Sequence, residues 1–215
     1  MPETIEKILQ RGACTSKQLQ ESTGLTQAGV SRRIRAMGNR IIRVKEGRTP
    51  EYMMTRNAFG GNDQLPLYMV DAHGNNTAIG TLRPLAHGGF YLEALTGLPK
   101  VLLGESKKGL FSDLPFFLFD LAPQGFIGRQ IASELSSQSN FPKDPKRWTS
   151  EQIGSYLVSN GEDLPGNLKF GKQAHLRVRK KPIPTTPDDY PLMAEHAIQG
   201  YIPGSSAGGE QPKFT

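Results

Sequence analysis

The chain has 215 residues, of which 36% are hydrophobic, with 24 glycines, 16 prolines and a net charge of +6. This length and composition favour several compact modules over one large core. A single cysteine, Cys14, excludes an internal disulfide framework, and one cysteine with four scattered histidines makes no metal cluster. The sequence has neither a signal peptide nor an apolar run long enough to cross a bilayer, which predicts a soluble, cytoplasmic protein.

The positive charge is concentrated near the N-terminus. Residues 1–60 carry eleven basic and five acidic side chains, so this segment alone accounts for the net charge of +6. A local excess of this kind is typical of a surface that meets phosphates, and it is equally compatible with an ordinary solvated surface.

Residues 1–58 are predicted to form a first domain. Hydrophobic spacing predicts a helix over 2–11, and Thr15 with Gln18 forms a capping-box pattern that starts a second helix, which ends at Gly24. A third helix is expected over 27–40, capped by Thr26. Its buried face holds Val30, Ile34 and Met37, and its opposite face holds the polar residues Gln27, Ser31, Arg32 and Arg35.

Two strands, at 41–47 and 51–56, are expected to follow with a turn at Gly47 and Arg48. This order of elements resembles the winged helix-turn-helix family. The resemblance implies that the third helix enters the major groove of duplex DNA while the hairpin, or wing, contacts the backbone or minor groove. It implies base or phosphate contacts by Gln27, Ser31, Arg32 and Arg35, and phosphate contacts by Arg43, Lys45 and Arg48.

The alternative is that the domain docks on a protein or forms a dimer, as other winged helices do. Gln27 and Ser31 would then be ordinary solvent-facing residues. A homodimer therefore stays open as well.

After a linker predicted at 60–64, residues 65–140 are expected to form a small antiparallel β domain with strands at 67–71, 77–83 and 89–95. A helix is predicted from Ile127. An apolar cluster indicates core packing against the sheet, with a ligand pocket as the less favoured alternative; it comprises Phe111, Leu114, Phe116, Phe117 and Phe119.

Residues 141–215 are predicted to contain a helix capped by Thr149, a strand at 167–171, a basic strand with a proline-rich loop over 173–191, and a short helix over 191–202. The chain ends on GYIPGSSAGGEQPKFT. Backbone N–H groups in a turn of small residues can form an anion-binding concavity, although glycine-rich loops without a ligand are common.

Three motifs, in this order, resemble the HipA-like serine/threonine kinases of bacterial toxin–antitoxin systems: IGTLRP at 79–84, FFLFDLAPQGF at 116–126 and SSAGGEQPK at 205–213. The added N-terminal winged helix resembles the YjjJ (HipH) branch of that family. The resemblance implies an α+β fold in which the β subdomain sits on the start of a protein-kinase-like N-lobe, within residues 141–215.

The same resemblance assigns roles to the last loop. Ser206 is the implied site of autophosphorylation, and Ser205 is a second candidate. The loop that covers the ATP phosphates would comprise Ser205, Ser206, Ala207, Gly208, Gly209, Gln211 and Lys213.

Phosphoryl transfer also needs a catalytic Asp and a residue that holds Mg²⁺. In the family these residues lie in the C-terminal lobe, so they are expected beyond Thr215. The complete kinase would use ATP and Mg²⁺, while this chain alone is expected to be inactive, with no metal or cofactor of its own.

Three hypotheses follow: the N-terminal part of a kinase toxin, a DNA-binding transcriptional regulator, or an antitoxin-like module that docks on a separate kinase lobe. The expected partners are double-stranded DNA and either the remaining kinase lobe or an antitoxin protein, with no membrane.

Overall fold

The computed structural model describes residues 3–46, 48–105, 108–161, 164–172, 174 and 184–199. Within these ranges the chain combines helices with antiparallel sheets, which confirms the predicted α+β class. It divides into two compact units. Unit 1 consists of Met1–Gln64 and Thr81–Pro115, and unit 2 consists of Leu65–Gly80 and Phe116–Thr215. The three predicted functional domains stay predictions.

The first helices of unit 1 follow the capping signals in the sequence. α1 (Ile5–Arg11) begins after Thr4, whose hydroxyl accepts a hydrogen bond from the backbone N–H of Lys7. α2 (Ser16–Thr23) begins with the predicted capping box and ends at Gly24, which has a left-handed φ of 71°. α3 (Gln27–Ala36) is shorter than predicted, because residues Gly38–Arg40 turn into a 3-10 helix.

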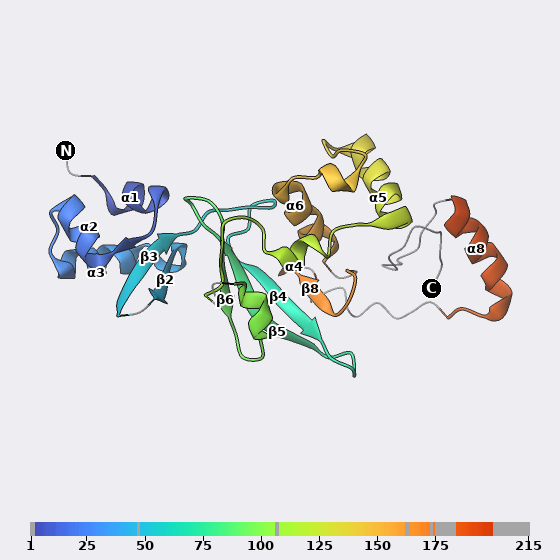
Figure 1. The fold of residues 1–215 in the computed structure, drawn as a ribbon, viewed down its shortest axis with the longest axis horizontal. Coiled ribbons are helices and arrows are strands. Elements are labelled where there is room, and N and C mark those ends of the chain that lie inside the picture. Colours follow the sequence, from blue (N-terminus) through green and yellow to red (C-terminus); the bar gives the residue numbers. More distant parts are fainter. Residues whose placement is uncertain are drawn as a thin grey trace. The chain divides into compact units, whose positions relative to one another are not determined.

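β2 (Ile41–Glu46) and β3 (Thr49–Met54) form the predicted hairpin, in which Arg43 lies opposite Tyr52. A further strand, β1 (Cys14–Thr15), was not predicted from the sequence. It pairs antiparallel with β3 and gives a sheet of order β1-β3-β2. A strand of two residues is too short to show a periodic pattern. In Figure 1, α1, α2 and α3 gather beside this sheet.

The three-stranded sheet has a hydrophobic core on each face, because successive strand residues point to opposite sides. On one face Met54 packs with buried residues of the helices, namely Ile5, Ile8, Leu9, Leu19 and Val30. On the other face Ile42, Val44 and Met53 pack with Leu85. The later part of unit 1 therefore covers the side of the sheet that the helices leave open.

That later part contains the end of β5 (Asn76–Pro84), β6 (Phe90–Ala94) and β7 (Leu110–Phe111). The segment at 60–64 is part of this compact unit, and its role as a linker between functional domains stays a prediction. Phe59 is 3% exposed and its ring stacks on that of Phe90 at 5.7 Å between centroids. The backbones of Ala58 and Asn62 exchange hydrogen bonds of 2.8 and 3.0 Å. Small polar residues suit a tight turn as well as a linker.

A five-stranded sheet has the order β7-β6-β5-β4-β8. β4 (Leu65–Val70) and β8 (Leu168–Phe170) pair antiparallel, with the buried Leu67 opposite the buried Phe170. The strands predicted at 67–71, 77–83, 89–95 and 167–171 are confirmed within one or two residues at their ends.

Unit 2 adds helices to its strands. They are α4 (Phe116–Phe119), α5 (Gly125–Gln138), α6 (Ser150–Asn160) and α8 (Tyr190–Gln199). The capping box predicted at Thr149 is present, with Gln152 as its partner. Trp148 is 6% exposed, packs against Phe141 and Tyr156, and donates its indole N–H to the carbonyl of Pro142 at 2.8 Å. The strand predicted within 173–183 lies outside the described residues, except for Ala174.

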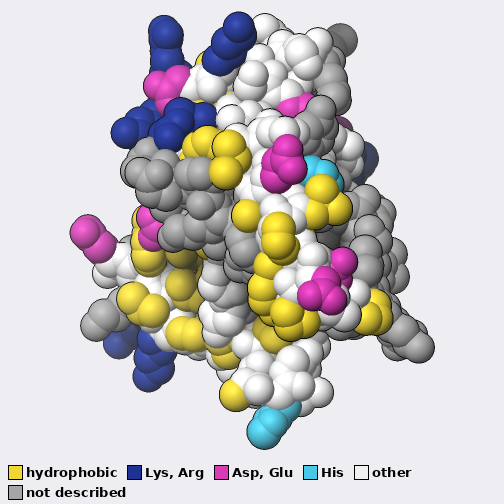
Figure 2. All heavy atoms as spheres, turned by 90° about the vertical axis from the view of Figure 1, so that its right-hand side faces the viewer, with side chains coloured by type: hydrophobic (Ala, Val, Ile, Leu, Met, Phe, Trp, Pro, Cys, Tyr) yellow, Lys and Arg dark blue, Asp and Glu magenta, His cyan; other side chains and the backbone are white. Residues whose placement is uncertain are grey.

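The aromatic cluster is only partly a core. Leu114 and Phe117 are buried as predicted, whereas Phe116 and Phe119 are 48% and 37% exposed, so the prediction is wrong for these two. A single helical turn cannot direct all its side chains to one side. Further hydrophobic side chains stand at the surface of α8, namely Tyr190, Leu192 and Ile198. Figure 2, which views the molecule from the α8 side of Figure 1, shows hydrophobic side chains at this surface.

Candidate nucleic-acid interface

The polar face predicted for α3 is exposed. Val30 is buried, and Ile34 and Met37 pack against the same core, so one side of α3 is fixed to the domain. The other side is in solvent, with Gln27, Ser31, Arg32 and Arg35 all exposed. The structure therefore brings these predicted side chains together on one helix face.

The three cations predicted in the wing are exposed too. Arg43 and Lys45 alternate along β2 with the buried Ile42 and Val44. Alternation places Arg43 and Lys45 on the same face of the sheet as Ile41, which packs against the helical core. Arg48 is exposed in the turn just before β3. Arg43 and Lys45 therefore project on the side of the sheet that carries α3.

Acidic partners are unevenly distributed among the cations of residues 1–58. Three cations outside α3 and the wing have them: Arg11 pairs with Glu3, Lys17 with Glu21 at 3.9 Å, and Arg40 with Glu6 at 2.7 Å. Lys7 and Arg56 form no ion pair with the described residues. In the part of the chain that the structure describes, no such partner is found for the cations of α3 and the wing, which are Arg32, Arg33, Arg35, Arg43, Lys45 and Arg48. Their charge is available to an anionic ligand.

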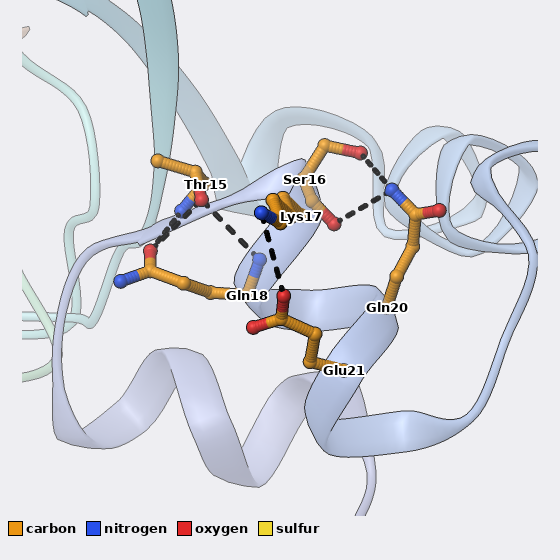
Figure 3. A network of polar contacts seen from close by, with 6 residues as sticks. All are labelled: Thr15, Ser16, Lys17, Gln18, Gln20 and Glu21. Atoms are coloured by element: carbon orange, nitrogen blue, oxygen red, sulfur yellow. Dashed lines mark hydrogen bonds and ion pairs between the residues drawn. The ribbon is translucent and has the colours of Figure 1, made fainter.

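A network of polar contacts lies at the N-terminus of α2, within the helix and its cap (Figure 3). The Thr15 hydroxyl accepts the backbone N–H of Gln18 at 3.3 Å, and the Gln18 side-chain oxygen accepts the backbone N–H of Thr15 at 2.8 Å. At the other end the buried Thr23 hydroxyl accepts the N–H of Leu25 at 3.3 Å, within the turn that leads to α3. Both ends of α2 are thereby fixed.

Sequence patterns did not single out Arg83, which is 6% exposed and belongs to unit 1. Its side chain donates to the backbone carbonyls of Asp63 and Asn39, the latter in the turn between α3 and β2. The sequence did contain a signal for this role, because Arg83 stands among hydrophobic residues at the end of β5. An arginine that is buried in a strand requires hydrogen-bond or ion-pair partners.

Cys14 and Tyr91 have shifted proton affinities. Burial, and secondarily the carboxylate of Glu51, raise the pKa of the Cys14 thiol, while Arg11 opposes them. Burial and Glu93 raise the pKa of Tyr91. Cys14 is thus kept in its unreactive thiol form near neutral pH, unlike an activated nucleophile.

The predicted phosphate-loop residues from Ser205 to Lys213 lie outside the described residues, so their roles stay predictions. In the described ranges no group of three or more acidic, histidine or cysteine side chains is arranged to hold a metal ion. Unit 2 does contain an open pocket of about 630 Å³, lined among others by Phe119, Arg129, Lys146 and Trp148. None of the helices in the described part has both the length and the hydrophobicity of a membrane span.

Comparison with known proteins places the sequence in a family. The model of the YjjJ-like toxin middle domain matches residues 61–179. A curated relative, Toxin YjjJ of Escherichia coli (strain K12), is 32% identical over 222 residues. That match covers 100% of this chain and 47% of the relative, so the chain spans about half the length of that protein. No solved structure matches. Since the family model covers more than half of its residues, the chain belongs to the YjjJ-like toxin family.

Proposed function

We propose that residues 1–58 are a winged helix-turn-helix domain that binds duplex DNA, and that this domain is part of a toxin of the HipA-like kinase class. One observation carries the DNA-binding part. The six cations of α3 and the wing are exposed and have no acidic partners in the described residues, whereas Arg11, Lys17 and Arg40 are paired with carboxylates.

The chemistry of the surface suits DNA. Arginine and lysine side chains neutralise backbone phosphates and release condensed counterions, which supplies affinity without sequence preference. Gln27 and Ser31, near the N-terminus of α3, offer donors and acceptors of the kind that read base edges. We therefore assign phosphate contact to Arg43, Lys45 and Arg48, and base or phosphate contact to the polar face of α3.

The test measures how binding depends on salt. The full chain is titrated against a fluorescently labelled duplex by anisotropy, at salt concentrations from about 50 to 200 mM. If five cations meet phosphates, the logarithm of affinity falls with the logarithm of salt with a slope of about −4.5. Neutralising Arg32→Gln with Arg35→Gln should make the slope shallower by about 2, because two contacts are lost.

A matched control separates this surface from net charge. Arg11→Gln with Lys17→Gln removes the same charge from cations that are already paired with Glu3 and Glu21. We expect this control to keep the original slope. Equal effects of both double variants, or no measurable binding at low salt, would refute DNA binding by this surface.

The toxin part of the proposal rests on family membership and on the kinase-like motifs. We propose that the complete protein transfers phosphate from ATP with Mg²⁺, that residues 205–213 contact the ATP phosphates, and that Ser206 or Ser205 accepts a phosphate. The proposed protein partners are the remaining kinase lobe or an antitoxin. Intact mass measurement after incubation with ATP and Mg²⁺ should show no added phosphate on this chain alone, and a phosphate on Ser205 or Ser206 when the complete toxin is present.

A further inference from the structure

The connection between α3 and β2 depends on polar contacts for its position. Residues Gly38–Arg40 contain no buried side chain, and Gly38 has a positive φ of 57°. A short connector that lacks apolar packing can change direction easily at such a glycine. The connector therefore contributes to the orientation of the wing against α3, together with the packing of Ile41 and Met54 on the helical core.

Arg83 of β5 holds the connector from the buried side. Its terminal nitrogen donates to the carbonyl oxygen of Asn39 at 2.6 Å, and its Nε donates to the carbonyl oxygen of Asp63 at 2.9 Å. Its charge is balanced by the carboxylates of Asp63 and Glu93, at 3.8 and 3.7 Å. The planar guanidinium can reach all these groups at once because its donors point in fixed, divergent directions.

The connector has two other sets of contacts: an ion pair between exposed side chains, and hydrogen bonds to the backbone carbonyl of Arg40. Arg40 pairs with Glu6 at 2.7 Å, but both side chains are about half exposed, so this pair adds little. Thr55 donates its N–H and its hydroxyl to the carbonyl of Arg40 at 2.8 and 3.1 Å. Arg83 is therefore the one charged side chain in the described part of unit 1 that ties the connector to β5 while buried from water.

We propose that Arg83 is a positioning residue of the DNA-binding surface: by clamping Asn39 and Asp63 to β5, it holds the wing in the orientation that lets Arg43, Lys45 and Arg48 act together with α3. The effect on DNA rests on the proposed function, whereas the effect on wing orientation rests on the contacts alone. The two parts can be tested separately.

The first experiment measures wing orientation without DNA. In the full chain, Cys14→Ser removes the single cysteine, and Arg35→Cys with Lys45→Cys then place spin labels on α3 and the wing, both at exposed positions. We expect one narrow distance distribution, which becomes broad or shifted on Arg83→Met. An unchanged distribution in a folded Arg83→Met protein would overturn the inference, whether or not the chain binds DNA.

Two further variants control the result. Glu93→Gln removes one carboxylate but leaves both carbonyl contacts of Arg83, so it should keep the narrow distribution. Arg83→Lys keeps the charge but loses the planar guanidinium with its several fixed donors. We therefore expect a distance distribution between those of the parent protein and Arg83→Met. If thermal melting shows that Arg83→Met does not fold, Arg83→Lys carries the test, and a distribution identical to that of the parent protein would then count against the clamp.

The second experiment uses the salt dependence of duplex binding. Arg83→Met should make the log–log slope shallower by about 3, the loss expected for three phosphate contacts. When Arg83→Met is added to a protein with a neutralised wing (Arg43→Gln, Lys45→Gln and Arg48→Gln), the log–log slope should not change further. A residue that merely stabilised the fold would lower the active fraction and leave the slope intact. Absence of DNA binding by the parent protein, together with a broadened distance distribution, would refute the proposed function and leave the clamp standing.

Discussion

Gly161 offers a decisive substitution in unit 2, because two physical effects of alanine have opposite signs there. Gly161 follows α6 with φ −63° and ψ −8°, a conformation that alanine adopts readily. Backbone preference alone predicts that Gly161→Ala stabilises the protein by about 0.4–1 kcal/mol. A Cβ at this position, however, would overlap the carbonyl oxygen of Phe170 and lie 2.8 Å from its carbonyl carbon.

The strand that carries this carbonyl cannot easily move away. Phe170 is fully buried and pairs with Leu67 in β4, and the N–H of Gly171 donates to the carbonyl of Pro66 at 2.9 Å. Forcing an extra methyl group into a packed site costs about 1–3 kcal/mol. Subtracting the backbone gain leaves an expected net loss of about 1–2 kcal/mol, which lowers the melting temperature by roughly 2–8 °C.

Trp148 provides the assay. It is the single tryptophan of the chain, lies in unit 2, and packs against Tyr156 of α6 with 5.6 Å between ring centroids. Its fluorescence should report the unfolding of unit 2 during thermal or urea denaturation. Gly29→Ala in α3 is the matched control, because its Cβ would meet neighbours only at 3.5 Å or more. It should stabilise unit 1, which is followed by circular dichroism because Trp148 lies in unit 2. A Gly161→Ala protein as stable as the parent would refute the steric argument.

Two other predictions concern unit 1. Thr15→Ala removes the hydroxyl of the α2 capping box and should cost about 1 kcal/mol of unfolding free energy, measured by urea denaturation followed by circular dichroism, while Thr15→Ser should be nearly neutral. Because burial and Glu51 raise the pKa of Cys14, its alkylation should be slower in the native than in the unfolded chain at the same pH, and Glu51→Gln should accelerate it. The raised pKa means that the folded state binds the Cys14 proton more tightly than the unfolded state does. The protonated thiol therefore contributes to stability below the unfolded-state pKa, and this contribution is lost as pH rises through the folded-state pKa.

The helix starts and the exposed polar face of α3 could be predicted from the sequence because their signals are local. The caps at Thr15, Thr26 and Thr149 each satisfy backbone N–H groups within three residues, so a short pattern is sufficient to find them. The polar face of α3 follows from the helical period of Val30 and Ile34. The division of the chain into two units could not be predicted from local patterns. Each unit combines two separate segments, which are joined by contacts between residues far apart in the sequence.

Periodicity, capping and charge act over a few residues, so the α+β fold class, most helices and strands, and the exposed cations of α3 and the wing followed from sequence patterns. The compact turn at 58–62, the completion of the first sheet by β1, and the contact of Arg83 with the connector before the wing became visible only in the folded chain. The contacts of β1 and Arg83 act over long separations in the sequence. The hydrogen bond from Arg83 to Asn39 joins residues 44 positions apart, and whether such a partner is in reach depends on the packed fold.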